Sequence, residues 1–162
     1  MMRKTKLLHE PPAIVTEAPQ IPPALENIEM DELGKAELAR VLIVEDDFLV
    51  AMELETGLAD AGFVVTGVAA TAEEAIRLAK AERPHLVIMD IRLASVRDGV
   101  DAALVLYKTQ GIRSLFATAH QDDNTMTRAE PARPLGWLEK PYVVNTLIAA
   151  IKDALPQLGK AN

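Results

Sequence analysis

Val-Leu-Ile-Val-Glu-Asp-Asp at positions 41–47 joins a run of four apolar residues to three consecutive carboxylates. A continuous apolar run rich in β-branched residues is typical of a strand that is buried on both faces of a parallel sheet. A helical pattern follows from Phe48 to Ala61 and stops at Gly62, a residue type that often terminates helices. The segment 41–62 therefore predicts a strand followed by a helix, with acidic side chains at the junction.

The same alternation continues as far as residue 155. Further strands are predicted at 63–68, 85–89, 113–117 and 136–138, and further helices at 71–82, 99–109 and 143–155, the last of them ended by Pro156. Thr71 and Glu74 have the spacing of a capping box. The stretch 121–135 is polar and carries two prolines, so we expect a short or irregular helix there. This order indicates an α/β fold with a central parallel sheet.

Residues 1–40 differ in composition from the rest of the chain. Five of the ten prolines lie within residues 1–23, and X-Pro steps favour extended backbone, which predicts a proline-rich tail or linker. Residues 24–39 lack proline and mix acidic with apolar side chains. They predict a short helix that packs on the domain, contacts a partner or stays solvated. The chain is thus divided into a tail at 1–40, a domain at 41–156 and a C-terminal tail at 157–162.

Composition argues against several classes of protein. Without cysteine, the chain has neither a disulfide framework nor a thiolate zinc site. A net charge of −7 at pH 7 argues against nonspecific binding to nucleic acid. No stretch approaches the ~20 apolar residues of a membrane span, and the basic start lacks the apolar run of a signal peptide. We therefore expect a cytoplasmic protein with no nucleic-acid or membrane partner.

Polar side chains follow four of the predicted strands. Glu45 and Asp46 come after the first strand, Asp90 after the third, Thr118 after the fourth and Lys140 after the fifth. Taken singly, each is more often a helix cap or a turn residue. The carboxyl ends of parallel strands, however, meet at one edge of the sheet, where open α/β sheets bind their ligands. The sequence therefore predicts a functional site that these residues build together.

The chemistry of these residue types suits phosphoryl transfer. Clustered carboxylates repel one another, and a divalent cation relieves that repulsion. Asp46 and Asp90 can bind Mg²⁺ directly, while Glu45 acts through a water molecule. Asp90 can then attack a phosphoryl group, with Lys140 pairing with the phosphoryl oxygens and Thr118 donating its hydroxyl. Asp90 is thus the predicted phosphoacceptor of a magnesium-dependent site.

Four motifs resemble the receiver domain of bacterial response regulators. They are Val-Leu-Ile-Val-Glu-Asp-Asp at 41–47, Val-Ile-Met-Asp-Ile-Arg-Leu at 87–93, Phe-Ala-Thr-Ala at 116–119 and Lys-Pro-Tyr at 140–142. The resemblance extends from about Val41 to Leu155. It implies a flavodoxin-like (βα)5 fold, a doubly wound parallel sheet with strand order 2-1-3-4-5. It also implies transfer of a phosphoryl group, with Mg²⁺, from a sensor histidine kinase or a phosphotransfer protein to the aspartate.

The resemblance also implies a role for each matching residue. Glu45 and Asp46 form the acidic pair, Thr118 is the switch hydroxyl, and Lys140 contacts the phosphoryl group. The backbone carbonyl of Arg92 is a further candidate metal ligand. Trp137 stands where the family usually has a switching tyrosine or phenylalanine. This indole either switches or is a fixed anchor.

Other positions depart from the common receiver pattern. Phe-Ala-Thr-Ala-His at 116–120 resembles the Phe-Ala-Thr-Gly signature of an atypical receiver subclass in alphaproteobacteria, with Ala119 in place of glycine. The loop from Asp90 to Gly99 is one residue longer than usual. Beside the acceptor, Arg92 could shield an acyl phosphate, and His120 could orient water or face solvent.

Three functions remain as hypotheses. Only residues 156–162 follow the last predicted helix, so we expect a stand-alone receiver that signals through its surface, with homodimer formation left open. A pseudo-receiver that binds partners without phosphorylation is the alternative, and metal-dependent phosphorylation separates the two. A haloacid-dehalogenase-type phosphatase would need an aspartate where this chain has Arg92. We therefore expect no enzyme activity beyond phosphorylation and dephosphorylation of its own aspartate.

Overall fold

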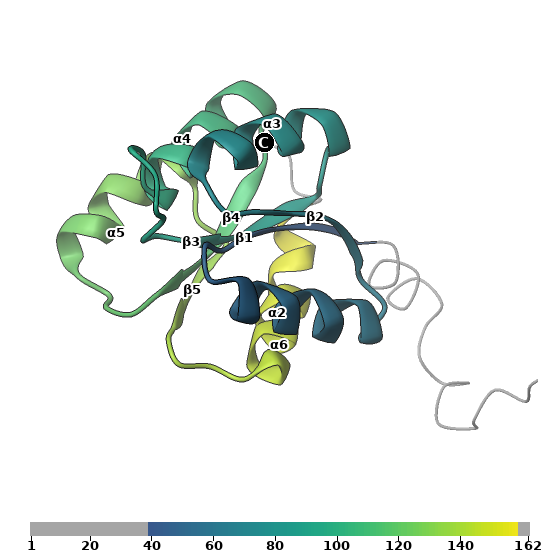
Figure 1. The fold of residues 1–162 in the computed structure, drawn as a ribbon. Coiled ribbons are helices and arrows are strands. Elements are labelled where there is room, and N and C mark those ends of the chain that lie inside the picture. The colour runs from purple at the N-terminus through teal and green to yellow at the C-terminus, as the bar shows by residue number, and fades with distance from the viewer. Residues whose placement is uncertain (1–38, 159–162) are drawn as a thin grey trace, which may run out of the picture.

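The computed structural model describes residues 39–158. Five parallel strands form one sheet in the order β2-β1-β3-β4-β5 (Figure 1), which confirms the predicted flavodoxin-like, doubly wound fold. The tail predicted at 1–40, its helix at 24–39 and the C-terminal tail at 157–162 lie outside the described residues, apart from the bordering residues 39–40 and 157–158. None of the helices within the described part is long and apolar enough to cross a membrane.

The strands and helices alternate as the sequence predicts. The strands are β1 (Arg40–Val44), β2 (Val64–Ala69), β3 (Leu86–Asp90), β4 (Arg113–Thr118) and β5 (Gly136–Glu139). The helices are α2 (Phe48–Asp60), α3 (Ala72–Glu82), α4 (Gly99–Gln110), α5 (Asp123–Ala129), the short 3₁₀ helix η2 (Glu130–Ala132) and α6 (Val144–Leu158). The short α5 and η2 confirm the irregular helix expected in the segment with two prolines.

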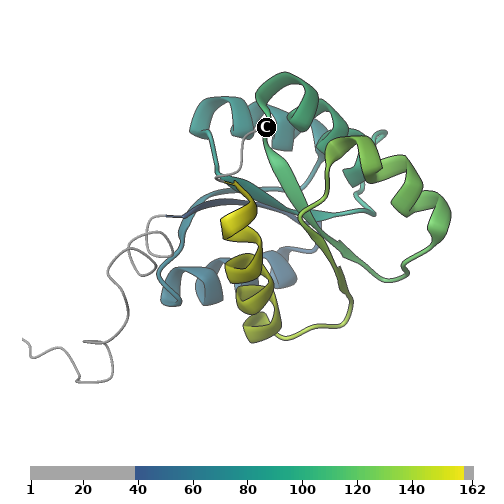
Figure 2. The same cartoon turned by 180° about the vertical axis from the view of Figure 1, so that it is seen from behind.

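The sheet lies between two layers of helices. Helices α3, α4 and α5 cover one face, and α2 and α6 cover the other (Figure 1, Figure 2). Because side chains alternate along a strand, Leu42 and Val44 enter the first core while Val41 and Ile43 enter the second. All four are at most 1% exposed, and burial of each such side chain stabilises the fold by about 1.5–3 kcal/mol. This two-sided burial is the physical reason for the continuous apolar run.

Two predictions about helix ends need correction. Thr71 caps α3 by accepting a hydrogen bond from the Glu74 N–H, but the Glu74 carboxylate accepts from the Ala70 N–H instead of closing the predicted box on Thr71. Pro156 does not end the last helix, which continues to Leu158, the last described residue. Leu155 and Leu158 both pack against the second core, so their burial outweighs the hydrogen bond that proline cannot donate.

Candidate functional site

Three carboxylates meet at the carboxyl edge of the sheet. Glu45 and Asp46 directly follow β1, and Asp90 is the last residue of β3, the neighbouring strand. One oxygen from each of the three lies within 4.8 Å of the others. Asp47, the next acidic residue, caps α2 instead, accepting from the N–H groups of Leu49 and Val50. The structure thus brings together the predicted acidic residues and separates them from the cap.

Lys140 reaches this cluster from the end of β5. Its Nζ lies 2.9 Å from Glu45 Oε2 and 3.1 Å from Asp90 Oδ2. The Glu45 and Asp90 side chains are only 4% and 8% exposed, so both ion pairs are largely shielded from water. The Lys140 N–H donates to the carbonyl of Thr118, which fixes the backbone from which the lysine extends. Three carboxylates and one ammonium group leave a formal charge of −2 at the site.

Burial and pairing shift the pKa values of this group in identifiable directions. Desolvation raises the pKa of Glu45 above its ordinary 4.5, and the hydrogen bond from Lys140 only partly opposes it. Desolvation lowers the pKa of Lys140, but the hydrogen bond to Glu45 and the charge of Asp90 outweigh it, so the pKa lies above 10.5. Ionisation of Glu45 therefore lowers the stability of the folded state as pH rises through the raised pKa of this residue. The Lys140 contribution is present below pH 10.5 and is lost as pH rises through its raised pKa.

Each carboxylate also accepts a hydrogen bond from one backbone N–H. Glu45 Oε1 accepts from Asp47 at 3.1 Å, Asp90 Oδ1 from Arg92 at 3.2 Å, and Asp46 Oδ2 from Ala94 at 3.1 Å. Sequence reasoning missed Ala94, because its contribution is a backbone group and no side-chain pattern marks it. These bonds orient the oxygens while leaving Asp46 exposed to solvent.

The donor set fits a magnesium ion. Mg²⁺ prefers oxygen ligands, a few carboxylates and several retained waters. Asp46 and Asp90 offer carboxylate oxygens, and the formal charge of −2 matches a divalent cation. Ligation by the Arg92 carbonyl and by Glu45 through water stays a prediction.

The other predicted site residues lie around the cluster without joining it. Thr118 ends β4 and is 6% exposed, but its hydroxyl donates to the carbonyl of His120 at 2.8 Å and accepts from the His120 N–H at 3.2 Å. The hydroxyl is thus engaged by its own loop. The Arg92 and His120 side chains are exposed. Their roles beside Asp90, and the switch role of Thr118, stay predictions.

Trp137 lies on β5 and stacks on Phe116 of the neighbouring β4. The ring centroids are 4.7 Å apart and the planes differ by 18°. The indole is half-buried and packs against the core that includes Ala129 and Ala132, next to the irregular helix. This packing fits the anchor hypothesis, whereas the switch hypothesis stays a prediction.

Comparison with known proteins identifies the family. The chain matches the response regulator receiver domain over residues 41–152, which is most of its length. It belongs to this family. The atypical Phe-Ala-Thr-Gly subclass, by contrast, stays a prediction.

Curated relatives and solved structures agree with this assignment. The transcriptional regulatory protein PdtaR of Mycobacterium tuberculosis (strain H37Rv) is 36% identical over 116 residues, covering 72% of this chain and 56% of PdtaR. The phyllosphere-induced regulator PhyR of Methylorubrum extorquens is 36% identical over 131 residues, covering 78% of this chain and 48% of PhyR. The receiver domain of a modulated diguanylate cyclase from Desulfovibrio desulfuricans G20 is 38% identical with a TM-score of 0.69, covering 75% of this chain and 96% of that structure. The receiver thus spans about half the length of these curated relatives.

Replacing Lys140 with methionine is expected to strengthen Mg²⁺ binding. The ammonium group now pairs with two of the three carboxylates and cancels one negative charge, so its removal should tighten the affinity by about tenfold. Isothermal titration at pH 8 measures the change. Lys152→Met, at an exposed lysine of α6, is the control and should bind Mg²⁺ like the unaltered receiver. Equal affinity in the two variants would contradict competition between Lys140 and the cation.

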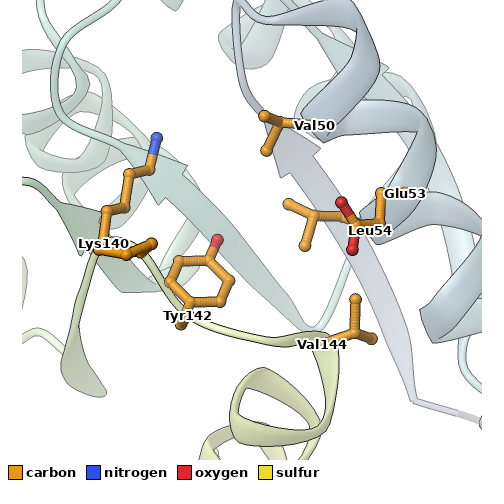
Figure 3. A pocket seen from close by; sticks show the side chains of 7 residues that line it. Val50, Glu53, Leu54, Lys140, Tyr142 and Val144 are labelled. Carbon is orange, nitrogen blue, oxygen red and sulfur yellow. The ribbon is translucent and has the colours of Figure 1, made fainter.

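A cavity of about 330 Å³ lies beside the site, between α2 and the segment that follows β5. It is lined by Val50, Glu53, Leu54, Lys140, Pro141, Tyr142 and Val144. The Tyr142 hydroxyl points into the space between Lys140 and Val50 (Figure 3) and has no hydrogen-bond partner among the described residues. Burial raises the pKa of this phenol, because the phenolate would lose its hydration there.

Replacing Tyr142 with phenylalanine is expected to leave the free energy of unfolding unchanged or to raise it by up to about 1 kcal/mol, because the buried hydroxyl gives up no bond within the described domain. Urea denaturation measures this. Tyr107→Phe is the matched control, because the Tyr107 hydroxyl accepts a hydrogen bond from Arg133 Nη1 at 3.4 Å. Losing this bond should lower the free energy of unfolding by about 0.5 kcal/mol. A larger loss in Tyr142→Phe than in the control would show that this hydroxyl has a partner.

Proposed function

We propose that this receiver is a phosphorylation-dependent switch of a two-component system in the cytoplasm. It accepts a phosphoryl group on Asp90 from a sensor histidine kinase or a phosphotransfer protein, and it signals by contact with a protein partner. The observation that carries the proposal is the grouping of Asp90 with Glu45, Asp46 and Lys140 at the carboxyl edge of the sheet. Homodimer formation and a stand-alone arrangement stay predictions.

Asp90 is the nucleophile of the proposed reaction. One of its carboxylate oxygens forms a bond to phosphorus while the bond from phosphorus to the donor's imidazole nitrogen breaks, and the electron pair returns to that nitrogen. Bound Mg²⁺, held by Asp46 and Asp90, would supply neutralisation of the charge on the phosphoryl oxygens. Lys140, 3.1 Å from Asp90, is placed to follow the incoming group and pair with one of its oxygens.

The Thr118 hydroxyl would then transmit the change. It is engaged by the backbone of His120 at present, so donating to a phosphoryl oxygen requires it to give up the His120 carbonyl. That exchange would move the loop between β4 and α5, next to the irregular helix. A surface altered in this way is the signal that a protein partner would recognise.

Intact-mass spectrometry tests the proposal. The protein is incubated with Mg²⁺ and either acetyl phosphate or phosphoramidate, with a chelated sample in parallel. We expect a single phosphate adduct that requires Mg²⁺ and maps to Asp90. Folded protein that binds Mg²⁺ but gains no adduct from either donor would favour the pseudo-receiver alternative.

A further inference from the structure

The edge of the sheet opposite the site is rich in basic residues. Parallel strands all begin there, and so do Arg40 and Arg113, the first residues of β1 and β4. Helices α3 and α4 and the 3₁₀ helix η2 end at the same edge and bring further cations to it. We call this set the basic edge: Arg40, Lys80, Arg83, Lys108, Arg113 and Arg133.

Most of this charge is not paired with a carboxylate of the described domain. Arg40 pairs with Glu82, but the other five form no ion pair with a carboxylate of residues 39–158. The carboxylates at nearby helix ends are Asp60, Glu82 and Glu130. Six bases against three acids leave a net charge of +3 at this edge, although the whole chain carries −7.

Arg113 and Arg133 show this crowding most clearly. The Arg113 guanidinium donates to three backbone carbonyls, those of Arg133 at 2.6 Å, Pro134 at 3.3 Å and Gln157 at 3.4 Å. Desolvation and then the charge of Arg133 lower the pKa of Arg113. The helix dipole does stabilise cations at helix C-termini, but backbone dipoles leave the formal charge uncancelled. A nearby anionic group would be attracted by the charge of both guanidinium groups.

The segment that enters the domain at this edge has the opposite charge. Residues 24–38 contain five carboxylates, Glu26, Glu29, Asp31, Glu32 and Glu37, and one lysine, Lys35, for a net charge of −4. Ala39, the next residue, is 2% exposed, and its carbonyl accepts from the Val64 N–H at 2.9 Å. The segment is therefore anchored at the basic edge by the start of β1.

We propose that residues 24–38 dock on the basic edge of their own domain. As a helix, this segment would be about 22 Å long, enough to cross the ~14 Å between β1 and β5. The covalent link gives it an effective concentration in the millimolar range, so modest charge pairing suffices. Because the basic edge and the Asp90 site lie at opposite ends of the strands, docking leaves the phosphoacceptor open. Of the three alternatives for the predicted helix, the proposal selects packing on the domain.

Paramagnetic relaxation in the full chain tests the proposal. The chain has no cysteine, so Met30→Cys gives a single site for a nitroxide label. At low salt we expect the label to reduce the amide signals of Gly111 and Leu135, beside the basic edge, by about half, and to spare Ala119 at the other edge. In about 1 M NaCl, where the Debye length is about 3 Å, these signals should recover.

Charge reversal separates docking from mere tethering. Arg83→Glu with Lys108→Glu should restore the signals, whereas the control pair Arg77→Glu with Arg97→Glu changes the net charge equally and should not. If the first pair unfolds the domain, Glu29→Lys with Glu32→Lys tests the segment itself, with Glu10→Lys and Glu17→Lys as its control. Signal loss that persists in high salt and in both test variants would come from the tether alone and would overturn the proposal. In a second sample, an isotope-enriched chain without the nitroxide is mixed with a nitroxide-labelled chain that is not isotope-enriched. Signal loss in this mixture would show that the segment of a second copy docks on the basic edge, and it would also overturn the proposal.

Discussion

Asp90→Asn is expected to abolish phosphoryl transfer to the receiver, with a fall in rate of at least about a hundredfold. An amide oxygen is a far weaker nucleophile than a carboxylate, and the substitution removes one of the oxygens that would hold Mg²⁺. The fold should survive, because asparagine has nearly the same shape and Lys140 keeps its 2.9 Å contact with Glu45. The rate of adduct formation with acetyl phosphate, followed by intact mass, gives the result.

Asp47→Asn is the matched control for this experiment. Asp47 is an exposed carboxylate next to the cluster, and its role is to cap α2, which asparagine does equally well. This variant should accept phosphate at close to the unaltered rate. If Asp90→Asn accepted phosphate as fast as Asp47→Asn, Asp90 would not be the acceptor.

Gly99→Ala is expected to destabilise the receiver by about 3 kcal/mol or more. Gly99 begins α4, and its N–H donates to the carbonyl of Ile91 at 2.8 Å. A Cβ at this position would overlap the backbone carbonyl oxygen of Asp90, which is not the mobile end of a side chain. The backbone of Asp90 would have to shift, at the cost typical of severe steric strain. Urea denaturation measures the loss of stability, and Mg²⁺ titration should show weaker binding.

Gly67→Ala controls for the substitution itself. A Cβ on Gly67 would lie 3.4 Å from the Leu78 side chain, an ordinary contact, and alanine suits a strand better than glycine. We expect a change of less than about 1 kcal/mol. Similar losses in the two variants would mean that the close approach at Asp90 has no special importance.

The sequence predicts the strands well because the sheet is buried on both faces. Apolar runs such as Val41–Val44 leave little choice of structure, and the polar, two-proline stretch correctly indicates a short helix. Pro156 misleads because its local preference competes with burial of Leu155 and Leu158, which only the packed helix reveals. The exact partner of Glu74 likewise depends on the path of the turn before α3.

The sequence predicts which residues form the site, but it does not predict the contacts between them. Asp90 ends one parallel strand and Lys140 directly follows another, and such strand ends meet at one edge, so the proximity of the two residues could be predicted. That the Ala94 N–H holds Asp46, and that His120 holds the Thr118 hydroxyl, depends on loop conformations that residue types do not encode individually. For the same reason, the clash that alanine would create at Gly99 is visible only in three dimensions.

The Glu45–Lys140 pair joins residues 95 positions apart, and this separation has a consequence for biosynthesis. While the chain is being translated, β1 and β3 emerge with their acidic ends well before the lysine that balances them. A nascent chain that stops short of β5 therefore holds repelling carboxylates without their counter-charge. Under the proposed function, the ability to accept a phosphoryl group should appear in one step, when β5 docks on β4, so incompletely synthesised chains would not be phosphorylated.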